Sequence, residues 1–252
     1  MAKIFLIASG KGGTGKSTCS AFLAEAAALS GLSVLVIELD AGLRVLDLLL
    51  DVGEIVYDLG DILTGACEPA QAIIPSKRTP NLSMISAPFN SEMRYDRDVL
   101  ILLCRWLGKR YDVIILDGGA GIGHNVRCGL AAADHVLVVT NPDIVSVRHA
   151  GTFAAIARQL SPAPLRMIIN RLPPGFPGKK NPQLPHLDAV IDLVAVQLIG
   201  VIPISDEIRR ASAAGTALLP DTPIAQIFSR IASRMIGRYV PLYIKTPKFK
   251  AN

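Results

Sequence analysis

Short runs of apolar residues recur along the chain, and most of them show no alternation with polar positions. They are rich in Ile, Val and Leu and are bounded by Gly, Pro, Asn or Asp. Strands that are covered on both faces have continuous apolar runs, whereas strands with one wet face alternate. The pattern therefore predicts strands of a mostly parallel sheet at residues 3–8, 33–39, 82–87, 112–116, 135–140, 165–169 and 197–202.

Longer amphipathic stretches separate these runs, as crossover helices would. The clearest predicted helices cover residues 16–30, 96–108, 144–159 and 223–237. Together the two patterns predict the α/β class, with a twisted parallel sheet and helices on both faces. With 252 residues, half of them hydrophobic, we expect one domain at 1–240 and a basic C-terminal tail at 241–252. The proline-rich stretch 173–186 is typical of an exposed loop.

The amino-acid composition limits the classes of partner that the protein can bind but does not identify one. The net charge of +5 would permit an anionic partner, but one Trp and 5% aromatic residues offer little for stacking bases. Nucleic-acid binding is therefore not expected. The first apolar run is too short for a signal peptide or a membrane span. No two cysteines form a C-x-x-C pair, so we expect buried thiols in a reducing cytosol at Cys19, Cys67, Cys104 and Cys128.

Residues 10–17 have the sequence GKGGTGKS, which matches the phosphate-binding pattern G-x-x-x-x-G-K-[ST] between a predicted strand and a predicted helix. Glycines let backbone N–H groups surround phosphate oxygens, and the helix start adds its positive dipole end. We expect Lys16 to reach the β- and γ-phosphates of ATP and Ser17 to bind Mg²⁺. The predicted nucleotide contacts of this loop are Gly12, Gly13, Thr14, Gly15, Lys16, Ser17 and Thr18.

Lys11 stands at the second position of this pattern, where the generic loop requires no lysine. With it, residues 11–18 (KGGTGKST) resemble the deviant phosphate loop of the MinD/ParA ATPase family, and of its MinD branch in particular. In that family the extra lysine reaches across a nucleotide-sandwiched dimer to the partner's phosphates. The resemblance implies that Lys11 neutralises charge on the transferring phosphoryl group in trans, as an arginine finger does. The alternative is a solvated lysine.

Residues 38–47 (ELDAGLRVLD) follow the second predicted strand, at the carboxyl end where open α/β sheets bind ligands. They are similar to the first switch of the MinD branch, D-x-D-x-G-L-R-x-L-D. The resemblance implies that Asp40 positions or activates the attacking water, which makes Lys11, Lys16 and Asp40 the candidate catalytic residues. A helix-capping role is the alternative for Asp40. Glu38 replaces the aspartate of the family pattern, and its role stays open.

The run at 112–116 ends on Asp117, which matches the second nucleotide-binding element of the family. The resemblance implies that Asp117 holds Mg²⁺ together with Ser17, through a water in the case of Asp117. Family members continue with Ser/Thr-Pro-Ala-Gly, whereas Gly118 and Gly119 stand here. Two glycines in place of a hydroxyl residue and a proline predict a more mobile segment, with altered switch dynamics and retained magnesium binding.

Residues after the later strands would complete the nucleotide site. The resemblance implies that Asn170, Arg171 and Pro203 flank the adenine ring and that the Asn170 amide reads its edge. At His149 and Gly151 the MinD branch has acidic residues that help to bind regulators. Partner recognition is thus expected to differ, although a solvated surface histidine is the simpler interpretation of His149.

The C-terminal part departs from the family. The helix at 223–237 has apolar residues on one face and arginines on another, as a core helix or an interfacial helix would. MinD proteins end in a basic amphipathic helix that binds membrane, but Pro247 breaks any helix through the basic tail of this chain. Binding to an anionic membrane surface is therefore a hypothesis. We expect a cytoplasmic protein, with peripheral attachment to the inner face of the cell membrane as an open alternative.

The resemblance implies a slow Mg²⁺-dependent ATPase that forms an ATP-sandwiched homodimer, places bacterial division machinery, and works with division-inhibitor and activator proteins. One alternative is a relative that controls flagellar number or placement, because residues 117–122 (DGGAGI) are similar to the D-T-G-A-G-I of that branch. Another is a nucleotide-dependent scaffold without hydrolysis. The iron–sulfur carrier ATPases share the loop but need paired cysteines, which this sequence lacks.

Overall fold

A computed structural model describes residues 1–42, 44–174 and 187–242. Its strands are β1 (Lys3–Ser9), β2 (Val34–Glu38), β3 (Ile74–Pro75), β4 (Leu82–Ile85), β5 (Val113–Ala120), β6 (His135–Thr140), β7 (Leu165–Leu172) and β8 (Gln197–Pro203). Its helices are α1 (Lys16–Leu29), α2 (Leu46–Leu49), α3 (Leu59–Thr64), α4 (Arg97–Leu107), α5 (His124–Ala132), α6 (Ile144–Leu160), α7 (Leu187–Val194), α8 (Asp206–Ala214) and α9 (Pro223–Met235), with a 3₁₀ turn at Pro69–Ala72.

The strands form one sheet in the order β3-β4-β2-β5-β1-β6-β7-β8. Every pair in it is parallel except β3 with β4. The seven apolar runs coincide with β1, β2 and β4 to β8, so the predicted fold class is confirmed. Strand β3 is two residues long, lies at the sheet edge and is not among the strands predicted from the sequence.

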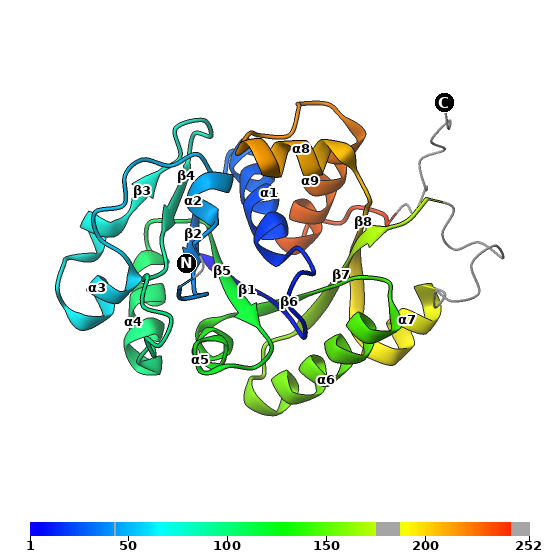
Figure 1. Cartoon of the computed structure of the whole chain (residues 1–252), viewed down its shortest axis with the longest axis horizontal. Coiled ribbons are helices and arrows are strands. Elements are labelled where there is room, and N and C mark those ends of the chain that lie inside the picture. The colour runs from blue at the N-terminus through cyan, green and yellow to red at the C-terminus, as the bar shows by residue number, and fades with distance from the viewer. Residues whose placement is uncertain (43, 175–186, 243–252) are drawn as a thin grey trace.

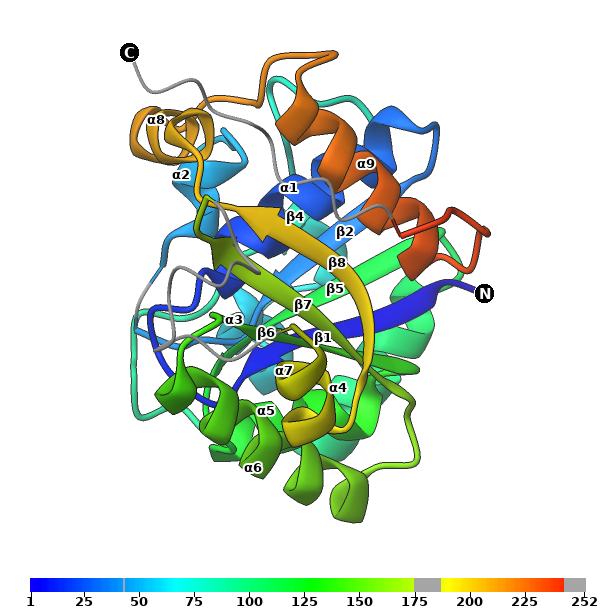
Figure 2. The same cartoon turned by 90° about the vertical axis from the view of Figure 1, so that its right-hand side faces the viewer.

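Helices cover both faces of the sheet (Figures 1 and 2). In β1, Phe5 and Ile7 face the layer that contains α1, α2, α8 and α9. The neighbouring Leu6 and Ala8 face the opposite layer, with α3 to α7. This alternation between two apolar layers explains why the strand has no polar face in the sequence. None of the helices in the part of the chain that the structure describes has the length and apolarity to cross a membrane.

Helix α9 belongs to the core, which decides between the two interpretations of its amphipathic pattern. Its Phe228 is buried and meets the Phe22 ring of α1 edge-on, at 5.4 Å between ring centroids. A Cβ at Gly200 in β8 would come within 2.5 Å of the Ile231 side chain, so helix and strand pack closely. One arginine of the other face also contacts protein, because the Arg234 guanidinium donates to the carbonyl of Ile199 at 2.9 Å. Most of the predicted tail, residues 243–252, lies outside the described residues, as does 175–186 of the proline-rich stretch.

A buried ion pair connects helices on the face of the sheet that α1 covers. The Arg78 guanidinium donates to Glu25 of α1 at 2.8 Å, and also to the carbonyls of Leu49, at the end of α2, and Gly215, after α8. Only 5% of the Glu25 side chain is exposed. Burial raises the pKa of Glu25, and Arg78 opposes that rise. One guanidinium thus joins three helical segments.

Replacing Arg78 with alanine is expected to lower the free energy of unfolding by about 3–5 kcal/mol, because it leaves the Glu25 carboxylate buried and unpaired. Urea denaturation measures this loss. The matched control is Arg209→Ala, which breaks an exposed pair with Asp206 and should cost less than about 1 kcal/mol. Equal losses in the two variants would show that the buried pair does not hold this corner together.

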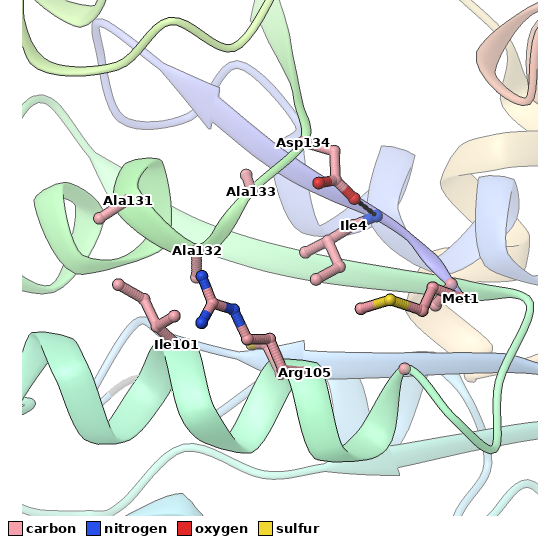
Figure 3. Close-up of a pocket in the computed structure, with 11 residues that line it drawn as sticks. Met1, Ile4, Ile101, Arg105, Ala131, Ala132, Ala133 and Asp134 are labelled. Atoms are coloured by element: carbon pink, nitrogen blue, oxygen red, sulfur yellow. Dashed lines mark hydrogen bonds between the residues drawn. The ribbon is translucent and has the colours of Figure 1, made fainter.

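A hollow of about 280 Å³ lies between α4 and α5, at the end of the sheet where β1 begins (Figure 3). At its side the Asp134 carboxylate accepts a hydrogen bond from the N–H of Ile4 at 2.9 Å, while the Asp134 N–H donates to the Ile4 carbonyl. These bonds fix the beginning of β1. The hollow is therefore remote from the loop that follows the end of β1.

Candidate functional site

The phosphate loop connects the end of β1 to the start of α1 and is braced from β7. The Nδ2 of Asn170 donates to the Thr14 carbonyl at 2.8 Å, and Nη1 of Arg171 donates to the Gly13 carbonyl at 2.9 Å. Gly13 and Gly15 have φ values of 77° and 89°, in the left-handed region that favours glycine. The loop is thus shaped by its own glycines and held by two side chains of a distant strand.

Gly10, the first residue of the loop, is needed for space. A Cβ at this position would lie 2.1 Å from the carbonyl oxygen of His149 in α6. Because that atom belongs to the backbone of a helix, it has little freedom to move away. The loop therefore rests directly on the main chain of α6.

The start of α1 is prepared for an anion. Its first turn has no acidic residue, and Gly15 at its N-cap provides no side-chain cap. Free N–H groups and the positive end of the helix dipole both favour phosphate. Lys16 is buried here, while Ser17 and Thr18 are partly exposed. The structure thus brings the predicted phosphate-binding residues together around one helix terminus.

Asp117 lies in β5 beside α1 and is completely buried. Its Oδ1 accepts a hydrogen bond from the Ser20 hydroxyl at 2.6 Å, whereas its Oδ2 has no hydrogen-bond partner among the residues that the structure describes. Burial raises the pKa of Asp117 to about 6, and the hydroxyls of Ser17 and Ser20 and the charge of Lys16 oppose that rise. A spare carboxylate oxygen near a serine hydroxyl is a donor set that suits Mg²⁺.

Asp40 follows β2 and stands beside the end of β5. It lines an open groove of about 450 Å³ between residues 91–94 and the start of α5. A Cβ at Gly119 would come within 2.9 Å of Asp40 Oδ1, so the glycine makes room for this carboxylate. The sequence predicted a mobile segment at Gly118 and Gly119. In the structure β5 continues to Ala120, and its register against β1 shifts between the Ile7–Asp117 and Ser9–Ala120 pairs, so the two glycines lie at an irregularity inside a strand. Their greater mobility stays a prediction.

The wall of this groove contains residues that the sequence analysis did not single out. The Oδ1 of Asn125 accepts a hydrogen bond from the N–H of Tyr95 at 3.1 Å, and its Nδ2 donates to the Met93 carbonyl at 3.0 Å. Nε2 of His124 lies 2.8 Å from the Tyr95 carbonyl. The first residues of α5 therefore fix the loop that faces Asp40. The only sequence signal for them is their place a few residues after the Ala-Gly of the second nucleotide-binding element.

Glu38, whose role the sequence left open, is completely buried at the end of β2. One carboxylate oxygen accepts hydrogen bonds from the N–H groups of Val45 and Leu46, at 3.0 and 3.3 Å. The other accepts one from the N–H of Ala87 at 3.4 Å. Burial raises the pKa of Glu38 to about 7, with the bond from Val45 opposing and the charge of Asp117 adding to the rise. Glu38 thus binds protein backbone on both sides.

Arg44 anchors the first switch from its outer side. Its Nε donates to the Ala87 carbonyl and its Nη2 to the carboxylate of Asp58, both at 2.6 Å. The guanidinium also lies 3.6 Å from the ring centroid of Phe89, a cation–π contact. Leu43, the other large residue of the Gly-Leu-Arg motif, lies outside the described residues. The motif therefore ties the switch to the end of β4 and to the start of α3.

On the predicted adenine side, Asn170 is buried and both atoms of its amide have partners. Its Nδ2 donates to the Thr14 carbonyl, and its Oδ1 accepts a hydrogen bond from the N–H of Arg171 at 2.9 Å. Pro203 ends β8 opposite Leu172. These contacts show that Asn170 and Arg171 brace the phosphate loop. Adenine binding by Asn170, Arg171 and Pro203 stays a prediction.

Lys11 is exposed at the tip of the loop, with Gly12 and Gly13. Within residues 1–42, 44–174 and 187–242 no carboxylate lies within ion-pairing distance of it. Close by, α6 begins with Ile144 and Val145, which are 57% and 52% exposed. A cation and two apolar side chains thus face outward beside the phosphate loop. The predicted action of Lys11 in trans stays a prediction.

Comparison with known proteins agrees with this geometry. Residues 5–219 match the CobQ/CobB/MinD/ParA nucleotide binding domain. The septum site-determining protein MinD of Helicobacter pylori is 33% identical over 95% of this chain and 92% of the relative. The structure is similar to a MinC:MinD cell division protein complex of Aquifex aeolicus, with a TM-score of 0.86, 28% identity and coverage of 96% of this chain and 99% of that one.

A second solved structure is also similar to this chain. It is the septum site-determining protein MinD of Pyrococcus horikoshii complexed with Mg-ADP, which is 28% identical, with a TM-score of 0.82 and coverage of 93% of this chain and 96% of that one. Both the sequence match and the fold extend over the phosphate loop, over β2 and the Asp40 that follows it, over β5 with Asp117, and over the helices that support them. The chain belongs to the MinD/ParA family of nucleotide-binding proteins.

Proposed function

We propose that this chain is an Mg²⁺-dependent ATPase that dimerises around ATP and, as a switch, positions cell-division machinery. The observation that carries the ATPase is one arrangement at the carboxyl ends of β1, β2 and β5. There, an uncapped helix start with Lys16 adjoins a buried aspartate that has a spare oxygen, Asp117, and an accessible aspartate, Asp40. The relatives named for septum-site determination support the place in division.

The loop supplies the phosphate binding in this mechanism. Backbone N–H groups of the loop and of the first turn of α1 bind phosphate oxygens, and Lys16 adds a positive charge. Ser17 and Asp117 would hold Mg²⁺, which neutralises phosphate charge when bound. Asp40, at the edge of the groove, orients the attacking water and accepts its proton.

In this mechanism, dimerisation brings a further positive charge, that of Lys11, to the phosphates. Lys11 is exposed and is not ion-paired in the described residues, so it is free to approach the phosphates bound by a second copy. In phosphoryl transfer, a cation that arrives from a partner neutralises charge in the transition state. ATP then controls assembly, because only the bound triphosphate joins the two copies. We infer that a division inhibitor of the MinC kind binds the ATP-loaded dimer, since a relative of this fold forms such a complex.

The central test measures phosphate release from ATP by the purified chain with Mg²⁺ and with EDTA in excess. We expect slow release with Mg²⁺ and none above background after chelation. Lys16→Ala should abolish ATP binding, measured with a fluorescent ATP analogue. Nucleotide binding without any phosphate release, alone or with partner proteins, would favour the scaffold alternative over the ATPase.

The alternative role in flagellar placement rested on the DGGAGI sequence at 117–122. In the structure Gly118 and Gly119 are explained by packing: a Cβ at Gly118 would come within 3.0 Å of the Ile7 carbonyl oxygen, and Gly119 makes room for Asp40. These contacts concern nucleotide chemistry and do not distinguish the two placements. The septum-site relatives favour division. Gene neighbourhood, and cell length against flagellar number in a deletion strain, would separate the two roles.

A further inference from the structure

We propose that Glu38 is a positioning residue, which anchors the first switch so that Asp40 keeps its place beside the bound phosphates. The first switch is defined here as residues 40–46, without Leu43, which is not described. The inference rests on the proposed ATPase function. It assigns Glu38 no contact with ATP, because its carboxylate is completely buried and bonded to backbone.

The carboxylate of Glu38 connects two segments that the sheet alone does not join. One oxygen holds the N–H groups of Val45 and Leu46, where α2 begins. The other faces the N–H of Ala87 and the hydroxyl of Ser86, which follow β4, at 3.4 and 3.5 Å. Strand β2, which carries Glu38, is the direct neighbour of β4 in the sheet, while α2 lies outside the sheet. A single side chain thus clamps the end of the switch to the rigid sheet.

Helix α2 needs this anchor because it has no cap of its own. It is four residues long, and Val45 at its N-cap has no side-chain oxygen to offer. The first N–H groups of a helix have no partner within the helix, and leaving them unpaired in a buried place is costly. Glu38 supplies from a neighbouring strand what a capping serine or aspartate usually supplies locally.

The length of the glutamate matters. Its carboxylate already lies 3.0 and 3.3 Å from the two nitrogens, near the upper part of the hydrogen-bonding range. An aspartate is shorter by one carbon–carbon bond, about 1.5 Å, which would move the oxygens out of that range unless the switch shifts.

The anchor acts on Asp40 through a short closed loop. Asp40 leaves β2 two residues after Glu38, and the chain returns to the same carboxylate at Val45. In between, the N–H of Gly42 donates to the Pro88 carbonyl at 2.9 Å, and Arg44 holds the outer side. Removing the inner anchor leaves Arg44 and Gly42 in place. The expected result is therefore a displaced Asp40 and not an unfolded switch.

The experiment compares Glu38→Asp with the wild-type chain, with Glu54→Asp as the matched control at an exposed position. For Glu38→Asp we expect kcat for ATP to fall by about tenfold, as small misplacements of reacting groups do, while KM and the Kd of a fluorescent ATP analogue change less than about twofold. Hydrogen exchange should accelerate in the peptide that contains Val45 and Leu46. Glu54→Asp should change none of these quantities.

Glu38→Gln provides a second variant of unchanged length. It keeps one acceptor for Val45 and Leu46, so exchange there should accelerate less than in Glu38→Asp. Unchanged kcat and exchange in Glu38→Asp would overturn the inference. A parallel loss of kcat, nucleotide affinity and melting temperature in both variants would overturn it as well, because it would show a general structural role. If the wild-type chain hydrolyses no ATP, the proposed function fails, while the exchange measurement still tests the anchor.

Discussion

Replacing Lys11 with alanine is expected to lower ATP hydrolysis by about 10³- to 10⁵-fold while ATP binding by the monomer stays within a few-fold of wild type. The exposed Lys11 makes no ion pair in the described residues, so its removal leaves the loop braced by Asn170 and Arg171. The loss comes from the charge that one copy delivers to the nucleotide of the other, and charge donors supplied in trans have effects of this size.

Two measurements define this result. Size exclusion with ATP and Mg²⁺ should show a dimer for the wild-type chain and a monomer for Lys11→Ala, and phosphate release gives the rate. The matched control is Lys109→Ala, an exposed lysine just beyond α4, which should behave as wild type. Lys16→Ala differs in kind, because it should lose nucleotide binding itself. An unchanged dimer formed by Lys11→Ala with ATP would contradict the sandwich arrangement.

Replacing Asp40 with asparagine is expected to reduce kcat by about 10²- to 10⁴-fold, the usual contribution of a positioned general base. Asparagine keeps the size of the side chain beside Gly119 but cannot accept the proton of the attacking water. Nucleotide binding does not depend on this carboxylate, so the variant should accumulate the ATP-bound dimer. Single-turnover hydrolysis and size exclusion would show the two effects together.

The control for Asp40→Asn is Asp98→Asn, because Asp98 is an exposed aspartate on α4 with 85% of its side chain accessible. It should hydrolyse ATP at the wild-type rate. If Asp40→Asn also hydrolysed ATP at that rate, Asp40 would be only a helix-capping or structural residue. A variant that neither dimerises nor hydrolyses would place Asp40 in nucleotide binding instead of in the chemical step.

The sequence predicted the sheet well because burial on both faces leaves a direct signal. A strand such as β1, with Phe5 and Leu6 packed in opposite layers, has no polar position to interrupt the apolar run. The phosphate loop was equally accessible, since its glycines and Lys16 serve a local geometry between one strand and one helix. The sequence of α9 was compatible with a core helix and with an interfacial helix. An amphipathic pattern indicates that one face is covered, but it does not identify what covers that face.

Other parts of the site depend on contacts between residues far apart in the chain. Glu38 reaches the backbone of Val45 and Ala87, and Asn170 reaches Thr14 across 156 positions of sequence. Backbone carbonyl and N–H groups are the same in every residue, so such partners leave no mark in the residue types. Gly119 shows a related difficulty: the sequence does not show that a side chain at this position would collide with Asp40, because Asp40 is far away in the chain.

The seat of the phosphate loop on α6 has a consequence for how this protein can change over evolutionary time. Gly10 meets the backbone carbonyl of His149, while the side chain of His149 is exposed to solvent. Any residue that keeps the helix can occupy position 149 without disturbing the support of the loop. The outer surface of α6 is therefore free to drift toward new partners while nucleotide binding is inherited unchanged.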